Sequence, residues 1–149
     1  MQEVINEMNL NFFSRSYNEG FARTTIAAFV SQLDPTIDEL ADIKTAVSEA
    51  VTNCIVHGYK DGIGKIYVSS KIYSNGKIVI RIRDTGCGIE NVEQAMEPLF
   101  TTGGSERSGL GFAVMQSFMD KIKVTSKLNK GTTVTLEKFI IRRAINNEK

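Results

Sequence analysis

The chain has 149 residues, of which 42% are hydrophobic and 23% are charged, and its formal net charge is +1. This length and composition are typical of one globular domain spanning residues 1–149, and we expect residues 140–149 to form a frayed tail. The near-neutral charge does not favour direct binding to nucleic acid or to an anionic membrane. No apolar run reaches the roughly 18 residues of a membrane span.

The histidine and cysteine content argues against a zinc site. His57 is the single histidine, and Cys54 and Cys87 lie far apart with no metal-ligand spacing. The first eleven residues are polar and acidic, unlike a signal peptide. We therefore expect a reduced protein in the cytoplasm.

The N-terminal part of the sequence predicts a strand followed by two helices. Apolar residues alternate with asparagines over residues 8–12, which favours a strand. They recur at helical spacing over residues 16–33, and an Asp-Pro pair ends that helix. Thr36 or Asp38 can cap the next helix, and we expect Gly58 to end it in the left-handed conformation.

The C-terminal part predicts two hairpins separated by a loop and a helix. The expected strands are residues 66–73, 78–83, 122–128 and 132–140. Asn75-Gly76 favours a type I′ turn in the first hairpin. Residues 91–108 show little periodicity and read as a loop, and residues 109–119 as a helix. The expected fold is an α+β two-layer sandwich, a mixed, mostly antiparallel sheet covered on one face by three helices.

Glu49 and Asn53 lie one helical turn apart at the edge of the apolar stripe of the second helix. A side chain at that edge can face a cleft between helix and sheet. An asparagine oxygen is a hard ligand that suits Mg²⁺, and a carboxylate can accept a proton from a hydroxyl or water. By itself, the pair is more typical of two solvated helix residues.

Two glycine-containing segments add the features of a ligand site. Asp84 ends a strand and can accept a hydrogen bond from an exocyclic amine such as that of adenine. Gly86 and Gly88 allow close backbone approach or positive φ. Gly109-Leu110-Gly111 precedes a helix, whose free N–H groups can bind phosphate. Neither segment is a P-loop or a dinucleotide fingerprint, but together with Glu49 and Asn53 they predict a nucleotide site.

Three further residues have a structural and a functional interpretation. His57 fits a helix C-terminal cap, a phosphoacceptor or a switch. Arg23 is turned away from the apolar stripe of its helix and fits a solvated charge or an interface residue. Cys87, between two glycines, either faces the ligand or is inert.

In this order the segments resemble the sequence boxes of the GHKL ATP-binding fold, which gyrase, Hsp90, histidine kinases and MutL share. The matching segments are Glu49-x-x-x-Asn53 (N box), Asp84-x-Gly86-x-Gly88 (G1 box), Pro98-Leu99-Phe100-Thr101-Thr102 (F box), Gly109-x-Gly111 (G2 box) and Gly131-Thr132-Thr133 (closing strand). From the length we expect no transducer domain, and no segment of the sequence supplies the histidine-bearing helix pair of a histidine kinase. The resemblance spans nearly the whole chain, and several boxes in register make it specific.

Within that fold the chain is similar to the anti-sigma serine kinases of sporulating Gram-positive bacteria. The similar segments are 18–23, 32–36, 43–53 and 106–109. The resemblance implies an anti-sigma factor that binds and inhibits sigma F. It also implies an ATP- and Mg²⁺-dependent kinase that phosphorylates a serine of an anti-anti-sigma factor, and a homodimer with its interface near the first strand. The alternatives are a general-stress anti-sigma serine kinase, a histidine-kinase-like catalytic domain, or a nucleotide-gated binding module without kinase activity.

The resemblance also implies a role for each matched residue. Glu49 would be the general base, Asn53 would hold Mg²⁺, and Asp84 would bind the adenine amine. Arg23 would contact both the sigma factor and the antagonist. The remaining nucleotide-binding residues would be Gly86, Gly88, Thr101, Thr102, Ser108, Gly109, Leu110, Gly111 and Thr133. The lid over residues 102–106 departs from some relatives, because it is short and lacks a Lys-Pro pair.

Overall fold

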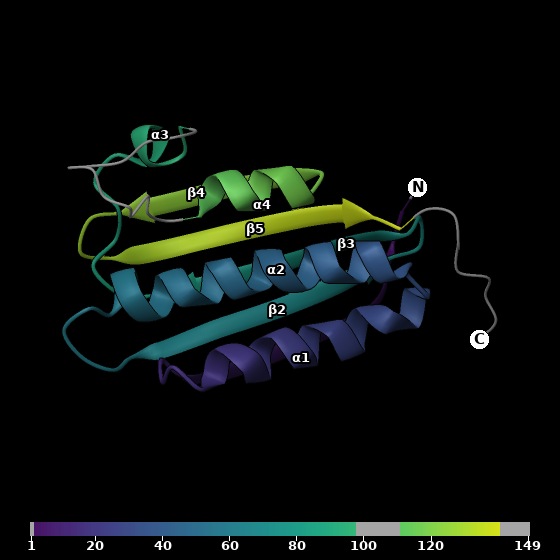
Figure 1. Cartoon of the computed structure of the whole chain (residues 1–149), viewed down its shortest axis with the longest axis horizontal. Coiled ribbons are helices and arrows are strands. Elements are labelled where there is room, and N and C mark those ends of the chain that lie inside the picture. The colour runs from purple at the N-terminus through teal and green to yellow at the C-terminus, as the bar shows by residue number, and fades with distance from the viewer. Residues whose placement is uncertain (1, 98–110, 141–149) are drawn as a thin grey trace.

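Five strands form one sheet in the computed structural model, which describes residues 2–97 and 111–140 (Figure 1). The strands are β1 (Val4–Phe13), β2 (Lys65–Tyr73), β3 (Lys77–Asp84), β4 (Lys121–Lys127) and β5 (Gly131–Phe139). Their order in the sheet is β1-β2-β3-β5-β4, and each neighbouring pair is antiparallel. The described sheet therefore contains no parallel pair, although the sequence allowed for one.

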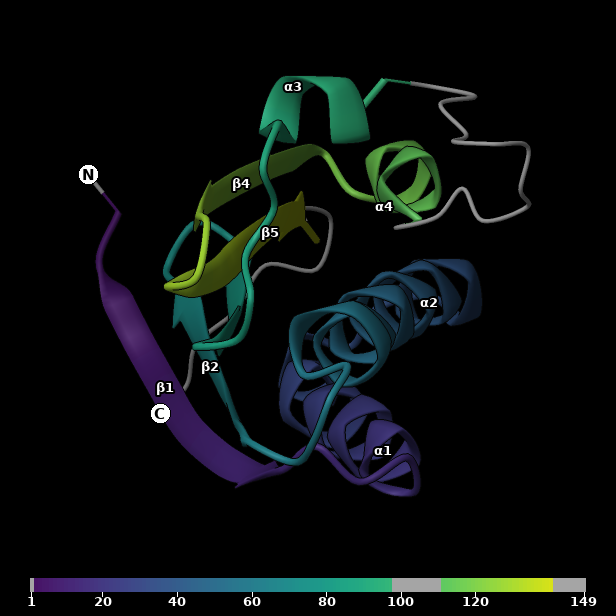
Figure 2. The ribbon, with the colours of Figure 1, turned by 90° about the vertical axis from the view of Figure 1, so that its left-hand side faces the viewer.

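Three helices cover one face of this sheet, as predicted. They are α1 (Asn18–Val30), α2 (Ile37–Asn53) and α4 (Phe112–Phe118), and Figure 2 shows them on the same side of the strands. A further single-turn helix, α3 (Val92–Ala95), lies beside β4. The expected two-layer α+β architecture is confirmed.

Alternation along the central strands explains why one face of the sheet is covered. Ile78, Ile80 and Ile82 of β3 are fully buried, whereas Arg81 and Arg83, which alternate with them, are exposed on the other face. Burying an isoleucine side chain stabilises a fold by about 1.5–3 kcal/mol. The inward residues of β3 therefore hold α2 and its functional residues against the sheet.

Ser70 of β2 places a hydroxyl in this apolar layer. Its side chain is 1% exposed, and its Oγ has no hydrogen-bond partner among the described residues. An unpaired buried hydroxyl costs about 1–3 kcal/mol.

We expect Ser70→Ala to raise the free energy of unfolding by about 1 kcal/mol, measured by urea denaturation. Ser69→Ala, on the opposite face of the strand, is the control, and a less stable Ser70→Ala variant would contradict the expectation.

The boundary between the first two helices follows local chemistry. After α1 the chain forms a 3₁₀ turn, Ser31–Leu33, and Asp34 then has a φ of 55°. Thr36 is the N-cap of α2, and it forms a capping box with Glu39. The Glu39 N–H donates to Thr36 Oγ1 at 3.1 Å, and the Thr36 N–H donates to Glu39 Oε1 at 2.8 Å. Of the two predicted caps, Thr36 is the correct one.

The type I′ prediction for the first hairpin is wrong. Such a turn needs a positive φ at both central residues, but Asn75 has a negative φ and only Gly76, at 90°, is positive. The Gly76 N–H donates to the Tyr73 carbonyl at 2.9 Å. This geometry is that of a three-residue loop, in which a type I turn is followed by a left-handed glycine.

The region between the hairpins is more ordered at its start than the sequence indicates. The stretch predicted as a loop from residue 91 contains α3, whose N-cap Asn91 accepts a hydrogen bond from the Gln94 N–H at 2.9 Å. One helical turn is too short to produce a recognisable period. None of the described helices is long and apolar enough to cross a membrane.

Candidate functional site

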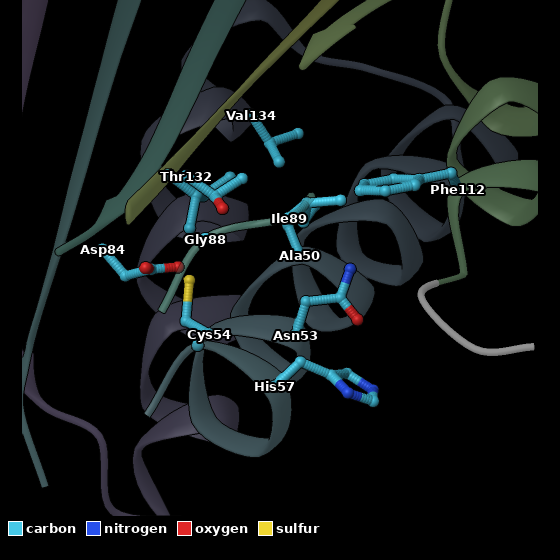
Figure 3. A pocket seen from close by; sticks show the side chains of 12 residues that line it. Ala50, Asn53, Cys54, His57, Asp84, Gly88, Ile89, Phe112, Thr132 and Val134 are labelled. Atoms are coloured by element: carbon cyan, nitrogen blue, oxygen red, sulfur yellow. The ribbon is translucent and has the colours of Figure 1, made fainter. Parts of the chain in front are cut away.

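A pocket opens between the C-terminal end of α2 and the adjoining ends of β3 and β5 (Figure 3). The space between its lining atoms, counted together with open solvent at its mouth, is about 360 Å³. It is lined by Ala50, Asn53, Cys54, His57, Gly58, Ile82, Asp84, Gly88, Ile89, Phe112, Thr132 and Val134. Segments far apart in the sequence thus meet around one cavity, whose walls are largely apolar.

Asp84 supplies a carboxylate to this apolar pocket. Its side chain is 4% exposed, and its Oδ1 accepts a hydrogen bond from the Gly86 N–H at 2.8 Å. The Cys54 side chain lines the same pocket, and its sulfur points toward the carboxylate (Figure 3). No ion pair to Asp84 is found in the described part of the chain. A buried carboxylate that accepts one backbone hydrogen bond keeps acceptor capacity for a ligand.

Gly58 has a different role from the predicted one. Its φ is not positive, and the chain passes from α2 into a π-helical turn, Cys54–Gly58, closed by the Tyr59 N–H donating to the Cys54 carbonyl at 2.9 Å. A Cβ at Gly58 would lie 2.9 Å from Asp84 Oδ2. The glycine is therefore needed because the turn approaches the Asp84 carboxylate closely.

Gly86 and Gly131 are also positions where a side chain would not fit, because another segment of the backbone lies too close. A Cβ at Gly86 would overlap the Gly58 carbonyl oxygen, and one at Gly131 would overlap the Asp84 carbonyl oxygen. Gly131 also has a φ of 117°. The loop after β3 and the start of β5 thus pack backbone against backbone. This contact fixes the rim of the pocket.

Tyr59 ties this loop to β2. Its hydroxyl accepts a hydrogen bond from the Thr85 N–H at 2.7 Å and lies 2.6 Å from the Lys65 carbonyl oxygen, to which it donates. Cys87 adds two contacts to the turn after α2, because its N–H donates to the Gly58 carbonyl at 2.9 Å and its Sγ lies 3.0 Å from the His57 carbonyl. The side chain of Cys87 does not line the pocket.

Asn53 and Glu49 occupy different parts of the site. Asn53 lines the pocket, as Figure 3 shows. Glu49, one turn earlier, lies against Gly111, because a Cβ on that glycine would overlap Glu49 Oε1. Gly111 has a φ of 63° and is the N-cap of α4. Burial raises the pKa of Glu49 above the usual value for a glutamate.

The structure assigns the predicted Thr133 position to its neighbour. Thr132 lines the pocket, whereas Thr133 lies with Arg83 and Thr125 on the other face of the sheet. Side chains two residues apart on a strand lie on the same face, so Thr132 shares a face with the buried Val134. Strand parity thus favours Thr132 as the side chain on the pocket side, and contact of Thr133 with a nucleotide stays a prediction.

Gly86 and Gly88 lie at the predicted rim, and Gly88, which lines the pocket, has a φ of 76°. The candidates Thr101, Thr102, Ser108, Gly109 and Leu110 lie outside the described residues. No sequence motif singled out Cys54, Ile89 or Phe112, which line the pocket. Their apolar character is as typical of a core as of a ligand site.

Arg23 lies outside the pocket but connects to α2. Its guanidinium donates to Glu19 Oε2 at 2.5 Å and to Ser48 Oγ at 3.3 Å. The Ser48 hydroxyl also donates to Glu19. Arg23 therefore contacts Ser48, which directly precedes Glu49. The Arg23 side chain is 37% exposed.

The pocket has the properties of a site for a flat heterocycle with an amine substituent. Apolar residues offer a surface for the ring, and the Asp84 carboxylate offers one directed acceptor. Nowhere in residues 2–97 and 111–140 do three His, Cys, Asp or Glu side chains gather as a metal-binding group. A hard cation here would depend on the Asn53 amide oxygen and on ligands other than the protein.

Comparison with known proteins identifies this arrangement. Residues 16–138 match the family model described as the histidine kinase-like ATPase domain. The chain is 59% identical over 139 residues to a protein of Thermoanaerobacter sp. (strain X514) named anti-sigma F factor, covering 93% of this chain and 96% of the relative. It is 55% identical over 138 residues to the anti-sigma F factor of Geobacillus thermodenitrificans (strain NG80-2), covering 92% and 94%.

A solved structure supports the same fold. The RsbU and RsbW domains of a Mycobacterium tuberculosis protein align with a TM-score of 0.68 at 19% identity, covering 97% of this chain and 35% of that one. From the sequence matches and the shared architecture together, the chain belongs to the histidine kinase-like ATPase domain family and, within it, to the anti-sigma F factors.

Proposed function

We propose that the pocket binds ATP, with the adenine between the apolar walls and its 6-amine donating to the Asp84 carboxylate. The observation that carries this proposal is a carboxylate 4% exposed in a pocket whose other walls are mainly apolar. An exocyclic amine donates where a carboxylate accepts, so adenine fits and the carbonyl of guanine does not. The phosphates would extend past Asn53 toward Gly111.

Asn53 is the residue we propose for Mg²⁺. Its side-chain oxygen is a hard donor at the edge of the pocket, and Mg²⁺ commonly takes one or two protein ligands together with phosphate oxygens and water. Bound there, the ion would neutralise charge that develops on the phosphates. Asn53 would orient the phosphate chain. Gly86 and Gly88 allow the backbone packing that forms the rim, because Cβ atoms there would overlap the carbonyl oxygens of Gly58 and Lys127.

Glu49 is the general base that we propose for transfer of the γ-phosphoryl group to a serine. Its carboxylate lies one helical turn from Asn53 and against the start of α4. It would accept the proton of the serine hydroxyl as the serine oxygen bonds to the γ-phosphorus and the bond to the β-phosphate oxygen breaks, leaving ADP. Positioning and charge neutralisation supply most of the catalysis in such reactions.

The partners that we propose are a sigma factor of the sigma F type, which the protein would inhibit, and an anti-anti-sigma factor, which would receive the phosphate. The relatives' name, anti-sigma F factor, supports the first. Arg23 is our candidate contact for both partners, because its part-exposed guanidinium can exchange Glu19 and Ser48 for a partner's carboxylate.

We also propose a homodimer through the uncovered face of the sheet near β1. That strand is at the sheet edge, and its Val4 and Ile5 are 41% and 47% exposed. Sedimentation equilibrium tests the assembly, and a monomer at all concentrations would exclude it. The protein would act in the cytoplasm, where its proposed partners work.

The function is tested by incubating the protein with γ-labelled ATP, Mg²⁺ and a candidate anti-anti-sigma factor. We expect label to appear on the partner as an acid-stable phosphoserine. Acid-labile label would favour a histidine-kinase-like domain, and ATP-dependent partner binding without label transfer would favour a nucleotide-gated module. Capture of a general-stress sigma factor in place of a sigma F type would favour the general-stress relative.

Gly58→Ala tests whether the turn after α2 protects the geometry of Asp84. The new Cβ would lie 2.9 Å from Asp84 Oδ2 and push the carboxylate from its position. We expect ATP affinity, measured by calorimetry, to fall about tenfold, as the loss of one good hydrogen bond predicts. Gly62→Ala is the control because a Cβ there meets nothing within 4 Å. Equal affinities of the two variants would refute this role.

A further inference from the structure

Ser126 of β4 is a polar residue beside the pocket to which the proposed function gives no role. The strand register places Asp84 opposite Thr132, and Thr132 opposite Ser126, so the three side chains form a row across β3, β5 and β4. They lie on the face of the sheet that the helices cover, because Thr132 shares that face with the buried Val134. Asp84 and Thr132 line the pocket, and Ser126 lies on the far side of Thr132 from Asp84.

Three groups contact the hydroxyl of Ser126. The Ile89 N–H donates to Ser126 Oγ at 2.8 Å. The Gly131 carbonyl oxygen lies 3.0 Å from Ser126 Oγ and accepts from it. The Thr132 hydroxyl lies 2.8 Å away, and either oxygen of this pair is able to donate. Thr–Ser hydrogen bonds between opposite strand positions are a known source of sheet stability.

The proton count decides the direction of the bond between Ser126 and Thr132. A serine hydroxyl has one proton and two lone pairs. The Gly131 carbonyl has no proton to donate, so it receives the proton of Ser126. The lone pairs of Ser126 Oγ then accept from the Ile89 N–H and from the Thr132 hydroxyl. All three contacts are hydrogen bonds only in this arrangement, which directs the Thr132 proton toward β4 and leaves lone pairs of Thr132 Oγ1 for a ligand.

We infer that Ser126 is a positioning residue for base recognition: it makes the Thr132 hydroxyl an acceptor, beside the Asp84 carboxylate, for the second proton of the adenine 6-amine. This inference rests on the proposed binding of ATP. Residues opposite each other on antiparallel strands have Cβ atoms about 4.5–5.5 Å apart. The two N–H bonds of an amine diverge, and two acceptors each about 2.9 Å from its nitrogen lie about 5 Å apart. The pair of Asp84 and Thr132 therefore suits the two protons of one amine.

The test compares ATP with purine riboside triphosphate, which lacks the 6-amine, in the wild-type protein and in three Ser126 variants. Calorimetry gives both affinities, and their ratio measures recognition of the amine. In Ser126→Ala the Thr132 proton can turn toward the pocket, so the ratio should fall about 3–10-fold, the range for one hydrogen bond. Ser126→Cys keeps nearly the same volume but offers a weak acceptor, so its ratio should fall as well. Ser126→Thr keeps the hydroxyl and should retain the wild-type ratio within about twofold.

Ser117→Ala is the matched control for the loss of a serine hydroxyl. Ser117 lies on α4, its Oγ donates to the Ala113 carbonyl at 3.1 Å, and it does not line the pocket. This variant should show the wild-type ratio of the two affinities.

Each result decides the inference. If Ser126→Ala keeps the wild-type ratio, or weakens the binding of both nucleotides by the same factor, the positioning role is overturned while the proposed function stands. A wild-type protein that binds both nucleotides equally overturns the adenine assignment of Asp84 and the inference with it. If Ser126→Ala fails to fold, as judged by its thermal transition, Ser126→Cys decides: a reduced ratio supports the inference, and an unchanged ratio contradicts it.

Discussion

Glu49→Gln is expected to bind ATP as the wild-type protein does and to transfer phosphate to the anti-anti-sigma factor about 10²–10⁴-fold more slowly. The glutamine keeps the size and polarity of the side chain beside Gly111 but cannot accept the serine proton. Binding is measured by calorimetry, and transfer by single-turnover labelling. The separation of the two effects is the signature of a base, because a residue that only bound nucleotide would change both.

Asp42→Asn is the control for the loss of a carboxylate from the same helix. Asp42 lies on α2, 3.8 Å from Lys138 Nζ, and does not line the pocket. A part-exposed ion pair of this kind contributes roughly 0–1 kcal/mol, so its loss should leave transfer unchanged. A normal transfer rate in Glu49→Gln would reject the proposed base.

The pH dependence of transfer provides a second measurement on Glu49. A base works in its ionised form, and burial raises the pKa of this carboxyl. The rate should therefore decline as the pH falls through that raised pKa, beginning at a higher pH than for an exposed glutamate. Glu49→Gln should lose this acidic limb. A limb that persists unchanged in the variant would belong to another group.

Asp84→Asn should lower ATP affinity about 10–100-fold, because a hydrogen bond to a charged group contributes about 1.5–3 kcal/mol. Asparagine retains one oxygen that can accept from the Gly86 N–H, so the loop after β3 should keep its conformation. The amide nitrogen, however, donates where the adenine amine also donates. Thermal unfolding with and without ATP reports both stability and binding.

Asp120→Asn is the matched control for that substitution. Asp120 Oδ2 also accepts a backbone hydrogen bond, from the Phe139 N–H at 2.8 Å, but Asp120 does not line the pocket. This variant should show the full stabilisation by ATP. Unchanged ATP affinity in Asp84→Asn would contradict the proposed adenine site.

Helices, strands and their boundaries were predicted well wherever they depend on a few neighbouring residues. The alternating isoleucines of β3, the Asp-Pro break after α1 and the Thr36 cap all act within a few residues, and the structure confirms each of them. The prediction for Gly58 was wrong. Gly58 carries no positive φ, because its constraint comes from Asp84, which lies 26 residues further along the chain.

The sequence by itself determined the family resemblance and the residues worth testing, since Glu49, Asn53 and Asp84 stand in recognisable spacing. Tertiary structure decided which of the candidates share a pocket. It placed Thr132 and Cys54 in the pocket with Asp84, and it placed Glu49 beside Gly111, outside the lining of that pocket. The physical reason is that strand parity and helix packing set where a side chain points, and both are fixed by long-range contacts between helix and sheet.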